Sequence, residues 1–136
     1  MVLSYALAKR NGKNYETLLR ERLLVPLGMN DTYVAKRPPR VRLAQGHLAN
    51  AMPAAPWDFP ADMAGVGGVR ATLPDMVRYM EGQLGARDSA VTPALTRTQE
   101  QVASVGGHRM GMSWILSTRN GHTIVAHDGG TGGYSS

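Results

Sequence analysis

The chain has 136 residues, of which 43% are hydrophobic, and carries a formal net charge of +5. This length fits one domain with a hydrophobic core, and no run of about 18 apolar residues predicts a transmembrane helix. Cysteine is absent, which excludes disulfides, zinc–thiolate sites and thiol nucleophiles and leaves the cellular compartment open.

The first predicted element is a helix over residues 2–10, which Asn11-Gly12 ends. Because no charged segment precedes its apolar residues, the sequence does not predict a signal peptide here. A second helix is expected after Asn14, whose side chain suits an N-cap, and Pro26 is expected to end it. Its apolar stripe, which we expect in the core, consists of Tyr15, Leu18, Leu19 and Leu23.

Residues 32–60 form an irregular, proline-rich segment, and such a segment in a small domain usually lines or covers something. Its basic run at 36–42 contains two prolines and no aromatic residues. We therefore expect a solvated loop and no nucleic-acid partner. Trp57 and Phe59 are expected to pack onto the core, with a pocket wall as the alternative, and His47 is expected to be structural.

The glycine-rich run at 65–69 lacks the Gly-Lys-Ser/Thr ending of a phosphate-binding loop, so it predicts close backbone packing. Thr72-Leu73-Pro74-Asp75 then matches a capping box, in which Asp75 would bond back to Thr72. An amphipathic helix is expected to follow, and a short helix from Thr92 to about Gln101. The methionines of the amphipathic helix are expected to fill the core rather than bind a metal or cofactor. Its apolar residues are Met76, Val77, Met80 and Leu84.

Apolar residues then repeat every second position from Met110 to Leu116, which predicts a strand. Asn120-Gly121 is a strong hairpin signal, and His122–Ala126 is the expected returning strand. This strand delivers His127 at its end. With helices and loops over residues 1–105 and antiparallel strands over 106–136, the sequence predicts an α+β fold in one domain.

Residues 127–136 read His-Asp-Gly-Gly-Thr-Gly-Gly-Tyr-Ser-Ser and place one titratable group beside a backbone almost bare of side chains. Such a segment suits a site in which a substrate lies against the main chain. On its own, the string could equally be a turn with a structural histidine.

Four segments in the same order resemble the class C β-lactamase-like family of serine hydrolases, which also includes DD-peptidases and esterases of the penicillin-binding fold. Tyr15–Thr32 resembles the family's helix and turn with its Pro-Leu-Gly-Met phrase, and Gly67–Met76 its glycine turn and capped helix. Met110–Trp114 resembles its Gly-Leu-Gly-Trp strand. His127–Tyr134 is similar to its third motif, which is Lys-Thr-Gly in lactamases and often His-x-Gly in esterase and peptidase-like members.

The resemblance implies acyl transfer through a serine ester of a small-molecule ester, amide or β-lactam, with no metal and no cofactor. The family's Ser-x-x-Lys motif is absent from this sequence, and no tyrosine stands in a matching Tyr-x-Asn context. We therefore expect residues 1–136 to be one incomplete β-lactamase-like domain, truncated relative to the family and inactive alone. The resemblance places its start just after the tyrosine motif and its end before the closing strands.

The resemblance gives His127 the place of the motif lysine, where it would contact a substrate carboxylate or tune proton transfer. Gly129 would let the substrate pass close to the strand, and Gly130 would offer its N–H as half of an oxyanion hole. Asp128 stands where lactamases carry threonine and would disfavour a β-lactam carboxylate, which favours an esterase or peptidase-like parent. Thr131 completes the predicted substrate-binding residues.

The alternative function is a non-catalytic structural or binding module that associates with itself. Strand edges left unpaired could pair between copies or exchange elements, which would give a homo-oligomer. Neither hypothesis includes a membrane or nucleic-acid partner.

Overall fold

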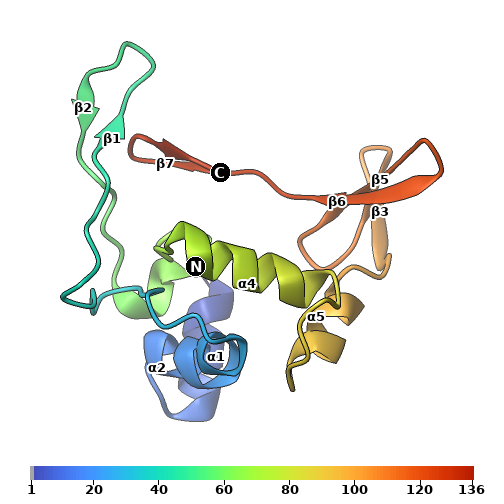
Figure 1. Cartoon of the computed structure of the whole chain (residues 1–136), viewed down its shortest axis with the longest axis horizontal. Helices are drawn as coiled ribbons and strands as arrows, with labels where there is room; N and C mark the ends of the chain where they lie inside the picture. Colours follow the sequence, from blue (N-terminus) through green and yellow to red (C-terminus); the bar gives the residue numbers. More distant parts are fainter. Residues whose placement is uncertain (1) are drawn as a thin grey trace.

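The computed structural model describes residues 2–136, in which helices and one small hairpin come first and the remaining strands follow (Figure 1). The helical part contains α1 (Val2–Asn11), α2 (Tyr15–Leu19), α3 (Val25–Leu27), α4 (Leu73–Gln83) and α5 (Thr92–Thr98). A π-helical turn, η1 (Arg20–Leu24), joins α2 to α3, and a 3-10 helix, η2 (Ala61–Val66), packs against α1 and α2. The predicted α+β class is confirmed.

Two predicted N-caps are confirmed. The Asn14 side chain accepts a hydrogen bond from the amide three residues later at 2.8 Å, and the Thr72 hydroxyl accepts one from the Asp75 amide at 3.4 Å. The second half of the predicted capping box is wrong, because the Asp75 carboxylate turns away from Thr72. Its Oδ2 atom accepts hydrogen bonds from the Asp31 amide and the Thr32 hydroxyl, both at 2.8 Å.

Two predicted helix ends differ from the structure. The helix after Asn14 continues past Pro26 and ends at Gly28, whose φ of 73° is left-handed. Pro26 is tolerated because it lies in the first turn of α3. The last helix, α5, ends at Thr98 rather than near Gln101.

The core lies where η1 and α3 meet α4 and α5. Leu24, Leu27, Met29 and Leu95 form its buried cluster, and the half-buried apolar side chains of Leu19, Leu23, Tyr79 and Val91 pack around it. The predicted stripe after Asn14 therefore faces the interior, as Leu18 is also buried.

The apolar face of α4 is exposed, which overturns the prediction that it is core. Helix α4 packs on α3 and α5 through its other side, where Gly82 and Gln83 are buried. The accessible surface of the chain, 9430 Å², exceeds by about 2,500 Å² the value of about 6,900 Å² expected for a compact monomer of this length. The exposed apolar residues of α4 and its C-cap, at 41–78% exposure, are Leu73, Met76, Val77, Met80 and Leu84.

The strand part contains a four-stranded antiparallel sheet in the order β3-β4-β5-β6. Its strands are β3 (Ala103–Val105), β4 (His108–Met110), β5 (Ile115–Arg119) and β6 (His122–Ala126). Asn120 and Gly121 join β5 to β6 with φ angles of 51° and 78°, as a type I′ turn requires, so the predicted hairpin is confirmed.

The strand predicted from Met110 to Leu116 is interrupted by a turn. The Gly111 amide donates to the Trp114 carbonyl at 2.8 Å, and Ser113 has a positive φ of 65°. Gly111 is pressed against α5, where a Cβ would lie 2.6 Å from the Thr98 carbonyl oxygen. The alternation therefore spans the end of one strand, a turn and the start of the next.

Two further hairpins lie at the other end of the molecule. Strands β1 (Gly46–His47) and β2 (Pro53–Ala54) form one, inside a segment that the sequence predicted as irregular, and β7 (Gly130–Thr131) and β8 (Tyr134–Ser135) form the other. Figure 1 shows the segment between β6 and β7 crossing from the four-stranded sheet to the β1–β2 hairpin.

Glycines in the run at 65–69 sit against other parts of the chain, as predicted. A Cβ at Gly65 would lie 2.8 Å from Ser4 Cβ, and one at Gly68 would lie 2.7 Å from Ala64 Cβ. In the part of the chain that the structure describes, no helix has the length and apolar character needed to cross a bilayer.

Candidate active-site wall

His127 follows the last residue of β6, with its imidazole exposed to solvent. The pairing of Ile115 with Ala126 ends the β5–β6 ladder, and one further step in the same register places Trp114 opposite His127. Their ring centroids lie 6.5 Å apart with an angle of 87° between the planes, an edge-to-face contact. Within residues 2–136, the imidazole makes no hydrogen bond.

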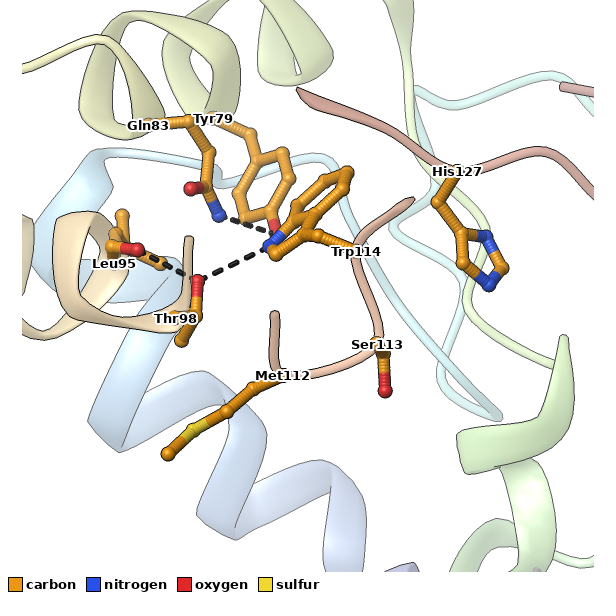
Figure 2. Close-up of a pocket in the computed structure, with 8 residues that line it drawn as sticks. All are labelled: Tyr79, Gln83, Leu95, Thr98, Met112, Ser113, Trp114 and His127. Atoms are coloured by element: carbon orange, nitrogen blue, oxygen red, sulfur yellow. Dashed lines mark hydrogen bonds between the residues drawn. The ribbon is translucent and has the colours of Figure 1, made fainter. Parts of the chain in front are cut away.

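An open groove with a volume of about 360 Å³ lies beside this pair. Figure 2 shows Trp114 between His127 and the residues from α4 and α5. The Trp114 indole N–H donates to the Thr98 hydroxyl at 3.1 Å, which in turn donates to the Leu95 carbonyl at 2.6 Å. The groove is lined by Tyr79, Gln83, Leu95, Thr98, Met112, Ser113, Trp114 and His127.

Burial raises the pKa of the Tyr79 hydroxyl, and the hydrogen bond that the Gln83 amide donates to it at 2.8 Å lowers the pKa in part. The net direction is upward, so Tyr79 is a neutral phenol at physiological pH. It can line the groove, but it cannot serve there as a phenolate base.

The strand after His127 directs one amide away from its own hairpin. The Gly129 amide donates to the Ser136 carbonyl at 3.0 Å, and the Ser136 amide donates to the Gly129 carbonyl at 3.1 Å. Hydrogen-bonded and non-bonded pairs alternate along antiparallel strands, so the next pair, Gly130 with Ser135, is a non-bonded one. The Gly130 N–H therefore points to the outer edge of β7.

The four glycines of this motif fall into two classes. A Cβ at Gly132 would collide with the Ala55 carbonyl and lie 2.7 Å from Trp57 Cδ1, and Gly133 has a positive φ of 79°. At Gly129 and Gly130 the nearest atoms would be 3.8 Å away, which is ordinary contact. Packing within the chain thus requires glycine at positions 132 and 133. At positions 129 and 130 it leaves space for an external group.

The remaining predicted side chains of the site, Asp128 and Thr131, lie on the segment that follows His127. Asp128 is exposed and makes no hydrogen bond or ion pair within residues 2–136. Thr131 is half-buried, and its Cγ2 would lie 3.0 Å from a Cβ at Gly67, so it contacts the glycine turn. Trp57 is exposed and packs on Gly132, so its predicted core position is wrong.

The β1–β2 hairpin holds the far end of the motif. The His47 amide donates to the Gly133 carbonyl at 2.9 Å, and the Tyr134 hydroxyl donates to the Ala44 carbonyl at 2.7 Å. His47 thus contributes its backbone, while its side chain is exposed.

Trp114 is the residue beside His127 that the sequence interpretation missed. The signal was present, because Trp114 and His127 lie equally far from the Asn120-Gly121 turn. A two-residue hairpin turn makes such positions cross-strand partners.

Replacing Gly132 with alanine is expected to destabilise the docking of the two hairpins by about 1–3 kcal/mol, because the new methyl group overlaps Ala55 and Trp57. Gly129→Ala is the matched control in the same motif, with its nearest neighbour 3.8 Å away. Urea denaturation followed by tryptophan fluorescence measures both. Equal stability of the two variants would contradict the conclusion that packing requires glycine at position 132 but not at position 129.

Comparison with known proteins agrees with this architecture. The β-lactamase family model matches residues 1–136, and the chain belongs to the β-lactamase family. It is similar to the D-alanyl-D-alanine-carboxypeptidase/endopeptidase AmpH of Escherichia coli K12, with 28% identity over 98% of this chain and 38% of that protein. Penicillin-binding protein 4 of Amycolatopsis lactamdurans is 31% identical over 90% of this chain and 37% of that protein.

Solved structures show the same fold. The octameric penicillin-binding protein homologue from Pyrococcus abyssi superposes with a TM-score of 0.75 at 24% identity, over 94% of this chain and 31% of that one. The β-lactamase/D-alanine carboxypeptidase from Pseudomonas syringae gives 0.73 at 25% identity, over 89% and 35%. The predicted family and fold are confirmed, and the chain spans about a third of the length of these relatives.

Proposed function

We propose that this chain supplies one wall of the acyl-transfer site of a serine hydrolase. The observation that carries the proposal is the short strand after His127, in which Gly130 directs its N–H outward and Gly129 and Gly130 leave their Cβ positions unfilled. A substrate carbonyl lying along this edge would meet a backbone donor three residues from a titratable side chain.

The nucleophile comes from a polypeptide outside these residues. The sequence contains no Ser-x-x-Lys, and the chain spans about a third of its relatives. The exposed apolar face of α4 is the surface on which we place the serine-bearing part of the domain, because about 2,500 Å² of surface beyond that of a compact monomer is uncovered. The isolated chain is therefore inactive.

In the completed site, the serine Oγ attacks the substrate carbonyl carbon and the carbonyl oxygen becomes an oxyanion. The Gly130 N–H and the N–H of the serine stabilise that charge. The leaving group departs with the proton that the serine hydroxyl lost. Water then hydrolyses the acyl-enzyme, which releases the acid and restores the serine hydroxyl. His127 contacts a substrate carboxylate or tunes the proton transfers, and Thr131 holds β7 in place.

Esters and amides are favoured over β-lactams as substrates. Asp128 lies next to His127, and its carboxylate would repel the carboxylate of a bound β-lactam. Among the relatives, AmpH is named as a carboxypeptidase and endopeptidase, and a protein of Aspergillus campestris, 26% identical over 98% of this chain and 28% of its own length, is named as an unguisins hydrolase.

A chimera tests the proposal. The isolated chain is expected to hydrolyse none of three probes, which are a nitrophenyl ester, a D-Ala-D-Ala peptide and a cephalosporin. The chain joined to the serine-bearing part of AmpH is expected to hydrolyse the ester, which has no carboxylate for Asp128 to repel. In the chimera, His127→Ala is expected to lower kcat/KM by about 10²-fold. His122→Ala, which replaces an exposed histidine at the start of β6, is the matched control.

Two outcomes would contradict this assignment. One is turnover by the isolated chain that persists through gel filtration and disappears in His127→Ala. The other is a chimera whose kcat/KM falls equally, or not at all, in the two histidine variants.

A self-associating module is the second candidate. Strands β3 and β6 are the edges of the four-stranded sheet, and the Pyrococcus abyssi homologue is octameric. A chain that stays monomeric at high concentration in sedimentation velocity would contradict this candidate.

A further inference from the structure

We propose that Trp114 is a positioning residue for His127, and that Thr98 holds Trp114 in place. The inference rests on the proposed function, because it matters for catalysis only if His127 acts in the site. It adds to the active-site wall a residue from the turn between β4 and β5 and one from the end of α5.

Trp114 is the side chain that fixes the direction of the His127 ring. The imidazole is exposed and has no hydrogen-bond partner within residues 2–136, so its rotamer is set by the edge-to-face contact with the indole. An exposed histidine without such a contact samples several rotamers, and its nitrogens then point in several directions.

The indole itself is held from two sides. Its N–H donates to the Thr98 hydroxyl at 3.1 Å, and the hydroxyl proton is directed to the Leu95 carbonyl at 2.6 Å, which orients the lone pairs of the oxygen toward Trp114. The turn is also fixed to the helix, because the Met112 amide donates to the Thr98 carbonyl at 2.8 Å. The last turn of α5 thus determines where His127 points.

Figure 2 shows the consequence for the groove. Trp114 separates the polar group formed by Tyr79, Gln83 and Thr98 from His127, so the imidazole stands on the open side of the indole. A misplacement of about 1 Å in a catalytic group can lower a rate by about 10²-fold, so the direction of this ring is a property that the site has to control.

NMR of the full chain tests the contact without catalysis. In ¹H–¹³C spectra, Trp114→Leu is expected to move the His127 ring resonances toward those of a solvent-exposed histidine, with His122 as the internal reference. Trp114→Phe keeps an aromatic ring and is expected to retain part of the shift. Thr98→Val keeps the indole but removes the hydroxyl that accepts its hydrogen bond, so an intermediate shift is expected. This variant also tests the proposal if Trp114→Leu fails to fold.

His127 resonances that stay unmoved in a folded Trp114→Leu or Thr98→Val variant would overturn the proposal. In the AmpH chimera, Trp114→Leu is expected to lower kcat roughly ten- to a hundredfold, with partial recovery in Trp114→Phe and no further loss when combined with His127→Ala. An unchanged kcat in Trp114→Leu beside a large loss in His127→Ala would overturn the positioning role. A chimera insensitive to His127→Ala would instead refute the proposed function, and the NMR result would still stand.

Discussion

Replacing Asp75 with alanine is expected to lower the free energy of unfolding by about 2–5 kcal/mol. Asp75 is 1% exposed, and its carboxylate accepts hydrogen bonds from the Asp31 amide, the Thr32 hydroxyl and, at 2.9 Å, the Arg78 guanidinium. Alanine would leave these three donors without their acceptor, and Thr32 is also fully buried. Since small domains are stable by only about 5–15 kcal/mol, a large share of the stability would disappear.

Asp58→Ala is the matched control for this measurement. Asp58 also pairs with an arginine, Arg70, at 2.6 Å, but its side chain is 82% exposed, so its loss is expected to change stability by at most about 1 kcal/mol. Urea titration followed by far-UV circular dichroism gives both values. Similar losses in the two variants would show that the buried carboxylate does not hold the 31–32 turn on α4.

Introducing a charge on the exposed face of α4 is expected to prevent the chain from completing an active domain. Val77 is 49% exposed, so Val77→Glu leaves the isolated chain folded with a hydrated carboxylate on a helix that tolerates glutamate well. If the serine-bearing part of the domain covers this face, the same carboxylate becomes buried without a partner, at a cost of several kcal/mol. Hydrolysis by the AmpH chimera is therefore expected to be lost.

The control is the same replacement at another exposed valine. Val25, on α3, is 56% exposed and lies outside the apolar face of α4, so Val25→Glu is expected to preserve hydrolysis. Circular dichroism of the isolated variants checks that both remain folded. Retention of activity in the Val77→Glu chimera would show that the serine-bearing part of the domain does not cover the apolar face of α4.

Local signals allowed much of the secondary structure to be predicted. Asn14 and Thr72 are N-caps because their side-chain oxygens reach an amide two or three residues away, and this geometry needs nothing from the rest of the chain. Asn120-Gly121 makes its hairpin for the same reason, since both residues accept positive φ angles.

Long-range contacts explain the wrong predictions. The Met110–Leu116 alternation could not reveal that Gly111 is pressed against α5, where the strand must stop. The Asp75 carboxylate has a nearby partner in the capping box, but its actual partners at 31–32 lie more than forty residues earlier. Periodicity predicted that the apolar face of α4 is core, but α4 packs on α3 and α5 through its other side and this face is exposed.

The site was predictable in part. Composition and family resemblance proposed His127 and Gly130 as candidate site residues. The difference between the two pairs of glycines depends on Ala55 and Trp57, which only the fold brings near Gly132. The position of Trp114 opposite His127 could have been predicted by counting residues outward from the hairpin turn, because the turn fixes the cross-strand pairs.

The segment from His127 to Gly130 is held at both ends, by the β5–β6 register and by the β1–β2 hairpin, and this arrangement limits where the chain can change length. Adding one residue between Ile115 and Gly132 would turn His127 or the Gly130 amide to the opposite side, because strand residues alternate between two faces. The tip at residues 48–52 is closed by its own hydrogen bond, and doubling the length of such a loop costs only about 0.6 kcal/mol. Insertions and deletions among family members should therefore gather at this tip and avoid the stretch from 115 to 132.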